Sequence, residues 1–304
     1  MLFLFAIMLH QYSAHFVNPV HSLQIYFTLF LIFETMHKEK SLSILVEEKE
    51  LESEHLERDV KIDFYLPTHV KHPENMSLLL INDGQDLSKM PFESILEDLY
   101  YYHEIEPLLC VGIHCGPDRK NEYGVAVQKD YLGRGAKAEA YTHFIFEELL
   151  PFVRKKYHVP HFKEKAFAGF SLGGLMALDI VWNHPHEFTK VGVFSGSLWW
   201  RQKAYEDGYT DEADRIMHNQ IRNTETIAPW LQFFIQTGAL DEKKDRNNNG
   251  IIDSIDDALD LINELKAKGY KDDAIEYLEL AEGKHDVPTW AKAFPDFLKW
   301  GWRE

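Results

Sequence analysis

The hydrophobic pattern of this chain alternates between short apolar segments and longer segments with helical spacing. Continuous apolar runs are typical of strands that are buried on both faces of a sheet. Such runs occur at 77–82 and 107–113, and further strands are expected at 165–170, 190–196, 231–238 and 275–283, with two extended segments at 42–51 and 58–67. Apolar residues recur at helical spacing in 92–103, 138–157, 172–185, 258–270 and 290–300. This alternation predicts an α/β domain with a mostly parallel central sheet and helices on both faces.

Residues 1–36 precede this pattern and are strongly apolar. Their apolar runs are too short to span a bilayer, and no lysine or arginine occurs before Lys38, so the positive n-region of a secretory signal is missing. We expect residues 37–304 to form a single folded domain, and residues 1–36 to be an anchor, a signal or a misassigned start. The predicted location is cytoplasmic if the true start lies near Met36, and membrane-anchored or exported otherwise.

Composition narrows the class of partner. With 304 residues, 45% of them hydrophobic, and a formal net charge of −17, the chain is typical of a soluble globular protein that repels nucleic acid and membrane phosphates. Cys110 and Cys115 are the only cysteines. In a strand they would lie on opposite faces and roughly 16 Å apart, so we expect free thiols. Association into a homo-oligomer is left open.

A glycine-flanked serine carries the candidate chemistry. Gly169-Phe170-Ser171-Leu172-Gly173 fits the pattern G-x-S-x-G, with an apolar strand before it and an apolar helix after it. In this context the pattern indicates a nucleophile elbow, where glycines permit a tight turn and the hydroxyl stands at a helix N-terminus. We therefore predict that the serine is a nucleophile.

A serine nucleophile needs a base, and histidine is the usual base near neutral pH. In an α/β-hydrolase the triad follows the order Ser, acid, His, with the histidine after the last strand. His285 occupies that loop. His184 and His186 lie at the far end of the helix that follows the serine, over ~18 Å away at 1.5 Å per residue. His114 comes too early in the chain to be the base.

The acid is expected after the strand at 231–238, which favours Asp241 and leaves Glu242 as the alternative. Weaker candidates further along the loop are Asp245, Asp253, Asp256 and Asp257. One oxyanion donor is expected to be the N–H of Leu172, and the other the N–H of Gln85, in the segment after the third strand.

Five segments in order carry a resemblance to a known family: INDGQDLS (81–88), GAKAEAYTHFIFEELLPFV (135–153), AGFSLGG (168–174), FSGSLWW (194–200) and GKHDVPTW (283–290). Over roughly residues 55–302 the chain resembles the putative-esterase branch of the α/β-hydrolases, which includes enterochelin-esterase-like proteins and feruloyl esterases. The resemblance implies an acid three residues after a strand-ending glycine, at Asp241. It also implies the oxyanion donor Gln85 and a tryptophan shortly after His285, here Trp290.

The segment 245–256, DRNNNGIIDSID, fits the first half of an EF-hand calcium loop. Its predicted ligands are Asp245, Asn247, Asn249, the carbonyl of Ile251, Asp253 and Asp256. Aspartate replaces the usual bidentate glutamate at the twelfth position, and a strand precedes the loop where an EF-hand has a helix. A structural calcium ion is one interpretation, and a polar turn that caps the next helix is the other.

Three tryptophans, Trp199, Trp200 and Trp290, are predicted to lie in loops at the edge of the sheet where its site forms. Aromatic side chains there suit the acyl or aryl group of an ester, and core packing is the alternative.

Together these features predict a serine carboxylic-ester hydrolase that forms an acyl-enzyme, acts on a small-molecule ester and requires no cofactor. An acyltransferase or a thioesterase would use the same triad. A non-catalytic calcium-binding or interaction module is the alternative from another class.

Overall fold

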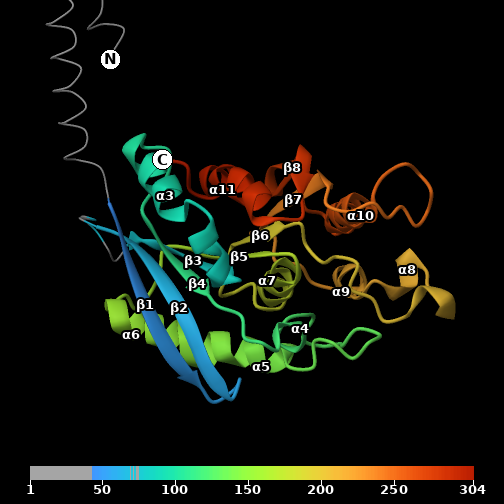
Figure 1. The fold of residues 1–304 in the computed structure, drawn as a ribbon, viewed down its shortest axis with the longest axis horizontal. Helices are drawn as coiled ribbons and strands as arrows, with labels where there is room; N and C mark the ends of the chain where they lie inside the picture. Colours follow the sequence, from blue (N-terminus) through green and yellow to red (C-terminus); the bar gives the residue numbers. More distant parts are fainter. Residues whose placement is uncertain (1–42, 69, 71, 73–74) are drawn as a thin grey trace, which may run out of the picture. The chain divides into compact units, whose positions relative to one another are not determined.

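The computed structural model describes residues 43–304 except 69, 71 and 73–74 (Figure 1). Residues 42–304 form one compact unit. The prediction for residues 1–36 lies outside the described residues. Within the described part of the chain, no helix combines the length and the apolar character needed to cross a bilayer.

One eight-stranded sheet, in the order β1-β2-β4-β3-β5-β6-β7-β8, organises the domain. Its strands are β1 (Ile44–Ser53), β2 (Arg58–Pro67), β3 (Ser77–Asn82), β4 (Leu108–Ile113), β5 (Lys165–Phe170), β6 (Lys190–Phe194), β7 (Gln232–Leu240) and β8 (Ile275–Lys284). The β1–β2 and β2–β4 pairs are antiparallel, and all the pairs from β4 to β8 are parallel. The predicted α/β fold with a mostly parallel sheet is confirmed. Because β3 and β5 to β8 run the same way, their carboxyl ends meet at one edge of the sheet.

Helices cover both faces of the sheet. They are α3 (Phe92–Tyr101), α4 (Arg119–Glu122), α5 (Ala138–His143), α6 (Leu150–Tyr157), α7 (Leu172–Asn183), α8 (Asp211–Asp214), α9 (Ile216–Asn223), α10 (Asp253–Ala267) and α11 (Val287–Trp302). Shorter turns are the 3-10 segments η2 (Gly84–Lys89), η4 (Tyr205–Asp207) and η5 (Asp272–Ala274). A core cluster on one face joins α3 and α11 to the strands, and a second cluster on the other face joins α5 to α7, α9 and α10. In Figure 1, α3 and α11 lie above the sheet, and α5 and α6 lie below it.

The helix predicted at 138–157 is interrupted by one π-helical stretch, η3 (Phe144–Leu149). Pro151 follows this stretch at the start of α6. Proline has no N–H to donate to the carbonyl of Glu147, and its ring clashes with that carbonyl, so a regular α-helix cannot continue there. The wider π turn accommodates the proline without ending the helical path.

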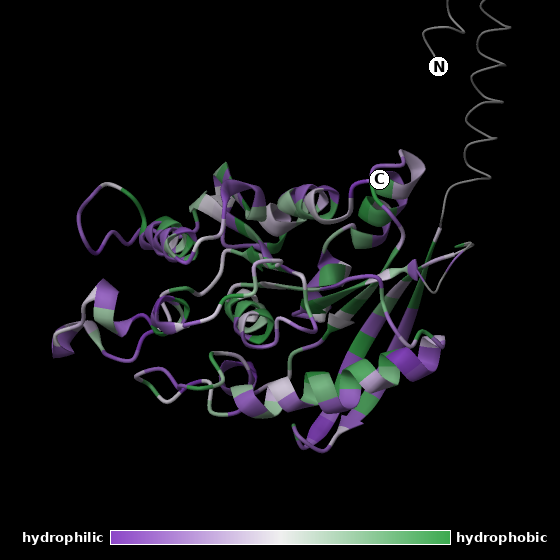
Figure 2. Cartoon of the chain, turned by 180° about the vertical axis from the view of Figure 1, so that it is seen from behind, coloured by the Kyte–Doolittle hydropathy of each residue, from purple (hydrophilic) through white to green (hydrophobic). Residues whose placement is uncertain are grey.

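The polar and apolar residues separate as the sequence pattern predicts. All six residues of β3 and all six of β4 are buried, which explains their continuous apolar runs. Figure 2 shows hydrophilic residues along the peripheral loops and hydrophobic residues in the central strands. Cys110 lies buried in β4 and Cys115 follows it, and both are free, as predicted.

Candidate active site

Ser171 lies at the turn between β5 and α7, with φ 55° and ψ −119°. These angles fall outside the regions that L-residues ordinarily occupy, and such a conformation costs about 1–3 kcal/mol. Surrounding hydrogen bonds hold it in place: the N–H of Ser171 donates to the carbonyl of Phe194 at 2.8 Å, and its own carbonyl accepts from the N–H of Ser197 at 3.0 Å. The turn therefore has the strained backbone that the sequence predicts for a nucleophile elbow.

Glycine is required on both sides of Ser171, because a side chain there would clash with neighbouring atoms. A Cβ on Gly169 would lie 2.3 Å from the carbonyl oxygen of Gly173, and a Cβ on Gly173 would lie 2.6 Å from Oδ2 of Asp83. Real Cβ atoms do not approach other atoms so closely. The side chain of Asn82 then secures the turn by donating to the carbonyl of Gly173 at 2.8 Å.

The strand register brings Asp241 and His285 to the same place. Leu240 at the end of β7 pairs with Lys284 at the end of β8. Asp241 directly follows Leu240, and His285 directly follows Lys284. Oδ2 of Asp241 accepts the N–H of Gly238 at 3.1 Å. Its Oδ1 is buried. Burial has the larger effect and raises the pKa of the carboxyl group, while the hydroxyl of Ser195 and the charge of His285 both lower it.

The electrostatics of this pair suit a neutral imidazole. Although His285 is exposed, part of its ring packs edge-on against Trp290, with ring centroids 5.5 Å apart. Desolvation lowers the pKa of His285 below its ordinary 6.5, and the positive charge of Arg119 lowers it further, while Asp241 opposes both effects. Burial raises the pKa of Asp241. His285 is therefore in its basic form at pH 7.

The predicted oxyanion donors are held by neighbouring elements. Leu172 is the first residue of α7, where N–H groups lack intrahelical acceptors. Gln85 lies in η2, and its side chain donates to Oδ1 of Asp83 at 3.1 Å and accepts the N–H of Cys115 at 3.1 Å. A Cβ on Gly84 would lie 2.4 Å from the carbonyl carbon of Gly112, so the η2 turn is pressed against β4.

Two features of the site escaped sequence analysis. Arg119 holds both oxygens of the buried Asp83, at 2.7 and 2.6 Å, and also donates to the carbonyl of Phe170 at 3.3 Å. It thus ties the η2 turn to the residue before the nucleophile. Oγ of Ser197 lies 3.4 Å from Oγ of Ser171. No local motif marks the Arg119–Asp83 pair, because its two residues are far apart in sequence. Ser197 lies in the FSGSLWW segment, but the sequence pattern does not assign it a function.

The three tryptophans occupy different environments. Trp199 is partly exposed and lines a cavity of about 230 Å³. Trp200 is completely buried in the core. Trp290 is buried in the first turn of α11, where it stacks on Phe170 with ring centroids 4.9 Å apart. The expectation that all three line a pocket in loops is therefore wrong for Trp200 and Trp290, because both pack in the core.

The predicted calcium loop after β7 is only partly assembled as expected. Asp245 accepts the N–H groups of Asn249 and Gly250, at 3.1 and 2.9 Å, and orders the turn. The prediction of Asp253 as a calcium ligand is corrected, because its buried carboxylate is engaged by the N–H of Arg246 at 2.7 Å and by the Arg246 guanidinium. No group of three or more His, Cys, Asp or Glu side chains suited to a metal occurs among the described residues.

Further side chains of the loop also bond to one another. Both Asn247 and Asn249 donate to the carboxylate of Asp256, at 2.8 and 2.9 Å. The N–H of Ile251 donates to Oδ1 of Asn249 at 2.7 Å.

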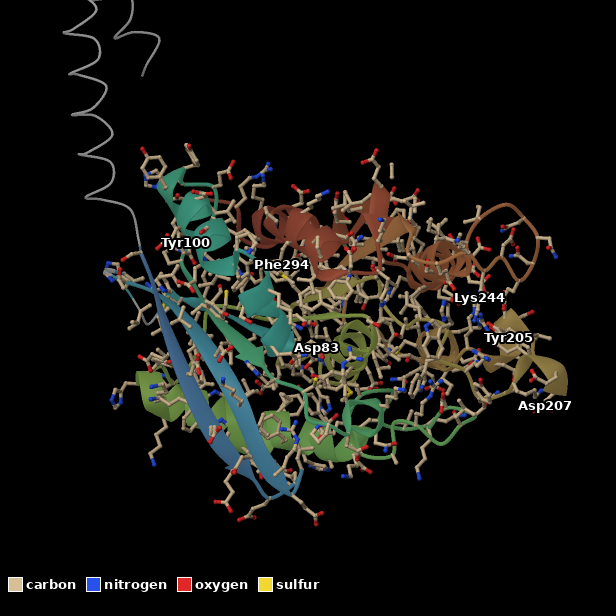
Figure 3. All side chains as sticks on the ribbon, viewed as in Figure 1. Asp83, Tyr100, Tyr205, Asp207, Lys244 and Phe294 are labelled. Atoms are coloured by element: carbon tan, nitrogen blue, oxygen red, sulfur yellow. The ribbon has the colours of Figure 1, made fainter. Side chains whose placement is uncertain are left out.

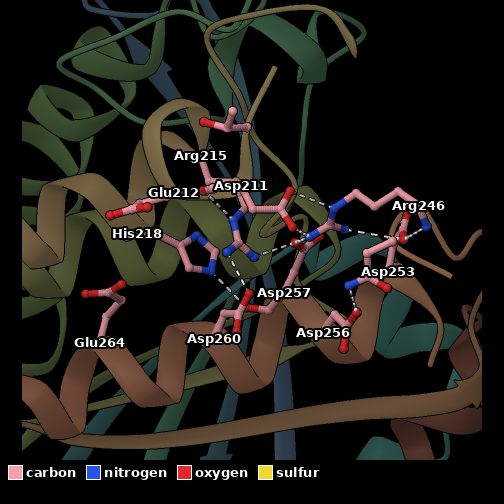
Figure 4. Close-up of polar contacts among 12 residues, drawn as sticks. Asp211, Glu212, Arg215, His218, Arg246, Asp253, Asp256, Asp257, Asp260 and Glu264 are labelled. Atoms are coloured by element: carbon pink, nitrogen blue, oxygen red, sulfur yellow. Dashed lines mark hydrogen bonds and ion pairs between the residues drawn. The ribbon is translucent and has the colours of Figure 1, made fainter. Parts of the chain in front are cut away.

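A network of ion pairs fixes the loop that follows Asp241. Figure 4 shows Arg246 reaching Asp211 in α8 and Asp257 in α10, at 2.8 and 2.7 Å, with Asp253 beside it. Arg215 binds the same Asp257 at 2.8 Å. Because these charges are partly or wholly buried, removing one partner would leave the others uncompensated. The network anchors α8, α9 and α10 around the segment that carries the candidate acid.

A parallel sheet with a strained serine elbow at its carboxyl edge defines an α/β-hydrolase. The family profile "Putative esterase" matches residues 53–300, and the chain belongs to this family. The uncharacterized protein YbbA of Bacillus subtilis (strain 168) is 24% identical over 158 residues, which cover 50% of this chain and 62% of that protein. The resemblance seen in the sequence is confirmed.

Solved structures show the same fold. Enterochelin esterase from Shigella flexneri superposes with a TM-score of 0.64 and 19% identity, covering 84% of this chain and 57% of that one. A ferulic acid esterase superposes with a TM-score of 0.63 and 17% identity, covering 85% of this chain and 97% of that one. The chain thus spans less than two thirds of the length of YbbA and of the enterochelin esterase.

Proposed function

We propose that the protein is a serine carboxylic-ester hydrolase that acts on small-molecule esters. Oγ of Ser171 attacks the ester carbonyl carbon, and His285 takes the serine proton and passes it to the leaving alkoxide. Asp241 orients His285 and stabilises its charged form. The N–H groups of Gln85 and Leu172 hold the oxyanion. Water, activated by the same imidazole, then releases the acid and regenerates the serine.

The backbone of Ser171 is the observation that carries this proposal. A serine held at φ 55° between glycines that admit no side chain has its hydroxyl presented at the N-terminus of α7. A small residue serving only a tight bend would not require this strain, because glycine adopts such angles freely. Strain of this kind is concentrated at functional sites.

The pair formed by Asp241 and His285 supports the same assignment. Both follow the paired ends of β7 and β8, where a bulge shifts the register, and the charge of His285 acts on the carboxylate of Asp241, which is the acceptor that an imidazole N–H requires. Glu242, the alternative acid, lines the cavity that Trp199 also lines. The geometry therefore favours Asp241.

A fluorophosphonate probe tests the proposal through its pH dependence. We expect the probe to label Ser171, as mapped by mass spectrometry, at a rate that falls as pH is lowered and His285 becomes protonated. Because the pKa of His285 lies below 6.5 in the folded protein, the rate should reach its plateau by pH 7 and have its midpoint below pH 6.5. Folded protein whose Ser171 is not labelled at any pH would refute the enzyme assignment.

The calcium loop remains a prediction and has its own test. If Asp245, Asn247, Asn249, Ile251 and Asp256 bind the ion, calcium at a hundred times its Kd should stabilise the protein by about 2.7 kcal/mol. We expect the melting temperature to fall by a few degrees in EDTA and to recover with calcium. The Asp245→Asn variant is expected to lose this response. A melting temperature of the wild-type protein that is the same in EDTA and in calcium would contradict the prediction that the loop binds calcium.

A further inference from the structure

The cavity beside the catalytic loops has an unusual wall. It holds about 230 Å³ and is lined by residues of three separate segments, among them Tyr131, Trp199, Arg201, Tyr205 and Lys244. In Figure 3, Tyr205 and Lys244 lie near each other, on the side of the molecule where α8 and α10 are found. Aromatic and cationic groups therefore share this wall.

Arg201 is a buried cationic residue of this wall that forms no ion pair with a carboxylate of the described residues. Only 9% of its surface is exposed, and no carboxylate of the described residues forms an ion pair with it. Its guanidinium lies between two rings, 4.5 Å from the centroid of Tyr131 and 4.0 Å from that of Tyr205. One in-plane hydrogen bond is made, from Nη2 to the hydroxyl of Tyr131 at 3.1 Å, and the buried Nε has no partner among the described residues.

This arrangement is costly unless a ligand completes it. A buried charge loses its hydration, and the tyrosine rings and one neutral hydrogen bond compensate for that loss less fully than a carboxylate would. Tyrosine rings pack against the guanidinium, and the N–H groups along the edge of a guanidinium are the part that binds oxyanions in pairs. An oxyanion is the ligand whose charge and shape match that edge.

The other charged groups of the cavity do not cancel Arg201. Arg134 is neutralised by the buried Asp130, which it contacts through Nε at 2.7 Å. Asp253 is engaged by Arg246. Two lining charges remain without an ion pair among the described residues, Lys244 and Glu242, and they are opposite in sign. Arg201 is therefore the buried cation of this cavity that no carboxylate of the described residues pairs with, although the carboxylates around Arg246 lie nearby.

Two segments that line the cavity adjoin predicted site residues in sequence, although no member of the predicted triad lines it. Glu242 is the residue after Asp241, and Trp199 is two residues after Ser197, whose Oγ lies 3.4 Å from that of Ser171. Since consecutive Cα atoms are about 3.8 Å apart, the backbone of this wall begins within about 8 Å of Ser197 and Asp241.

We propose that the cavity binds an oxyanion carried by the ester substrate, so that the preferred substrates are esters with a carboxylate or phosphate on one side of the scissile bond. The anion lies against the edge of Arg201, with Lys244 adding long-range attraction, and Trp199 and the tyrosines contact the apolar part that joins the anion to the ester. This inference rests on the proposed esterase function.

Matched ester pairs test it. Para-acetoxybenzoate is compared with para-acetoxybenzamide, and para-nitrophenyl hydrogen succinate with para-nitrophenyl succinamate, so that the anion is on the leaving group in one pair and on the acyl group in the other. We expect the wild-type protein to prefer the charged member of at least one pair. In Arg201→Met, kcat/KM for that charged ester should fall about 10- to 100-fold more than for its neutral partner, mainly through KM.

Two further variants control the experiment. Arg201→Lys keeps the charge without the paired N–H edge, and we expect it to restore part of the preference. Lys243→Met removes an exposed charge from the neighbouring loop and should leave the preference unchanged. Competitive inhibition of wild-type protein by benzoate and by phenyl phosphate, with benzamide as the neutral reference, distinguishes a carboxylate from a phosphate.

The inference and the proposed function fail separately. Equal losses for charged and neutral esters in Arg201→Met, or a wild-type preference for the neutral member of both pairs, would overturn the anion site while leaving the esterase intact. If no ester is hydrolysed and Ser171 is not labelled, the function fails instead. Calorimetry with benzoate then tests the anion site by itself. Benzoate binding to the wild-type protein that is lost in Arg201→Met supports the anion site, and absence of benzoate binding to the wild-type protein overturns it.

Discussion

Replacing Ser171 with alanine is expected to reduce kcat for hydrolysis of para-nitrophenyl acetate by about 10⁴-fold or more, with little change in KM. The hydroxyl oxygen is the atom that forms the acyl-enzyme, and no neighbouring group has the same position. Ser197 is nearest, with its Oγ 3.4 Å away, but it lies after β6 and not at the elbow. Steady-state kinetics, with fluorophosphonate labelling of the same preparations, measure the loss.

The stability of the variants shows whether the loss is chemical. Alanine retains the strained backbone at φ 55°, whereas glycine relieves strain worth about 1–3 kcal/mol. Ser171→Gly should therefore melt at or above the temperature of Ser171→Ala, and both should be inactive. Ser197→Ala serves as the matched control for loss of a nearby hydroxyl. If Ser171→Ala keeps more than a tenth of the activity while Ser197→Ala does not, the nucleophile has been misassigned.

The fold was largely predictable because the central strands of this sheet are buried on both faces. A strand with no solvent-facing side has no polar alternation, so 77–82 and 165–170 stand out as apolar runs, and their ends coincide with β3 and β5. The helices α8 and α9 were missed. Asp211–Asp214 is entirely polar apart from one alanine, and its helical turn depends on a cap by Thr210 and on distant ion pairs, which local patterns do not reveal.

The candidate site was predictable only where chemistry follows strand order. Ser171, Asp241 and His285 each follow a strand directly, so their places could be read from the chain. Trp200 could not be placed in this way, because its burial depends on the backbones of Gly124 and Gly135, which approach its ring. The same is true of Arg201, whose lack of a counter-charge is a property of three segments that meet only in the fold.

Replacing Asp241 with asparagine is expected to lower kcat by about 10³- to 10⁴-fold. The asparagine side-chain oxygen can still accept the N–H of Gly238, so the backbone after β7 should keep its path. What changes is the buried Oδ1: an amide NH₂ in its place donates and cannot accept the N–H of His285 that the proposed mechanism requires. The imidazole is then held in the wrong tautomer, and its charged form loses its counter-charge.

The pH profile separates this effect from simple loss of structure. Because the negative charge of Asp241 raises the pKa of His285, its removal should move the acid limb of kcat/KM to still lower pH, although the plateau is much reduced. Glu242→Gln is the comparison, since Glu242 is the alternative acid on the same loop. If Glu242→Gln causes the greater fall in kcat and moves the acid limb while Asp241→Asn does not, then Glu242 orients the histidine, and the register of β7 against β8 does not define the triad.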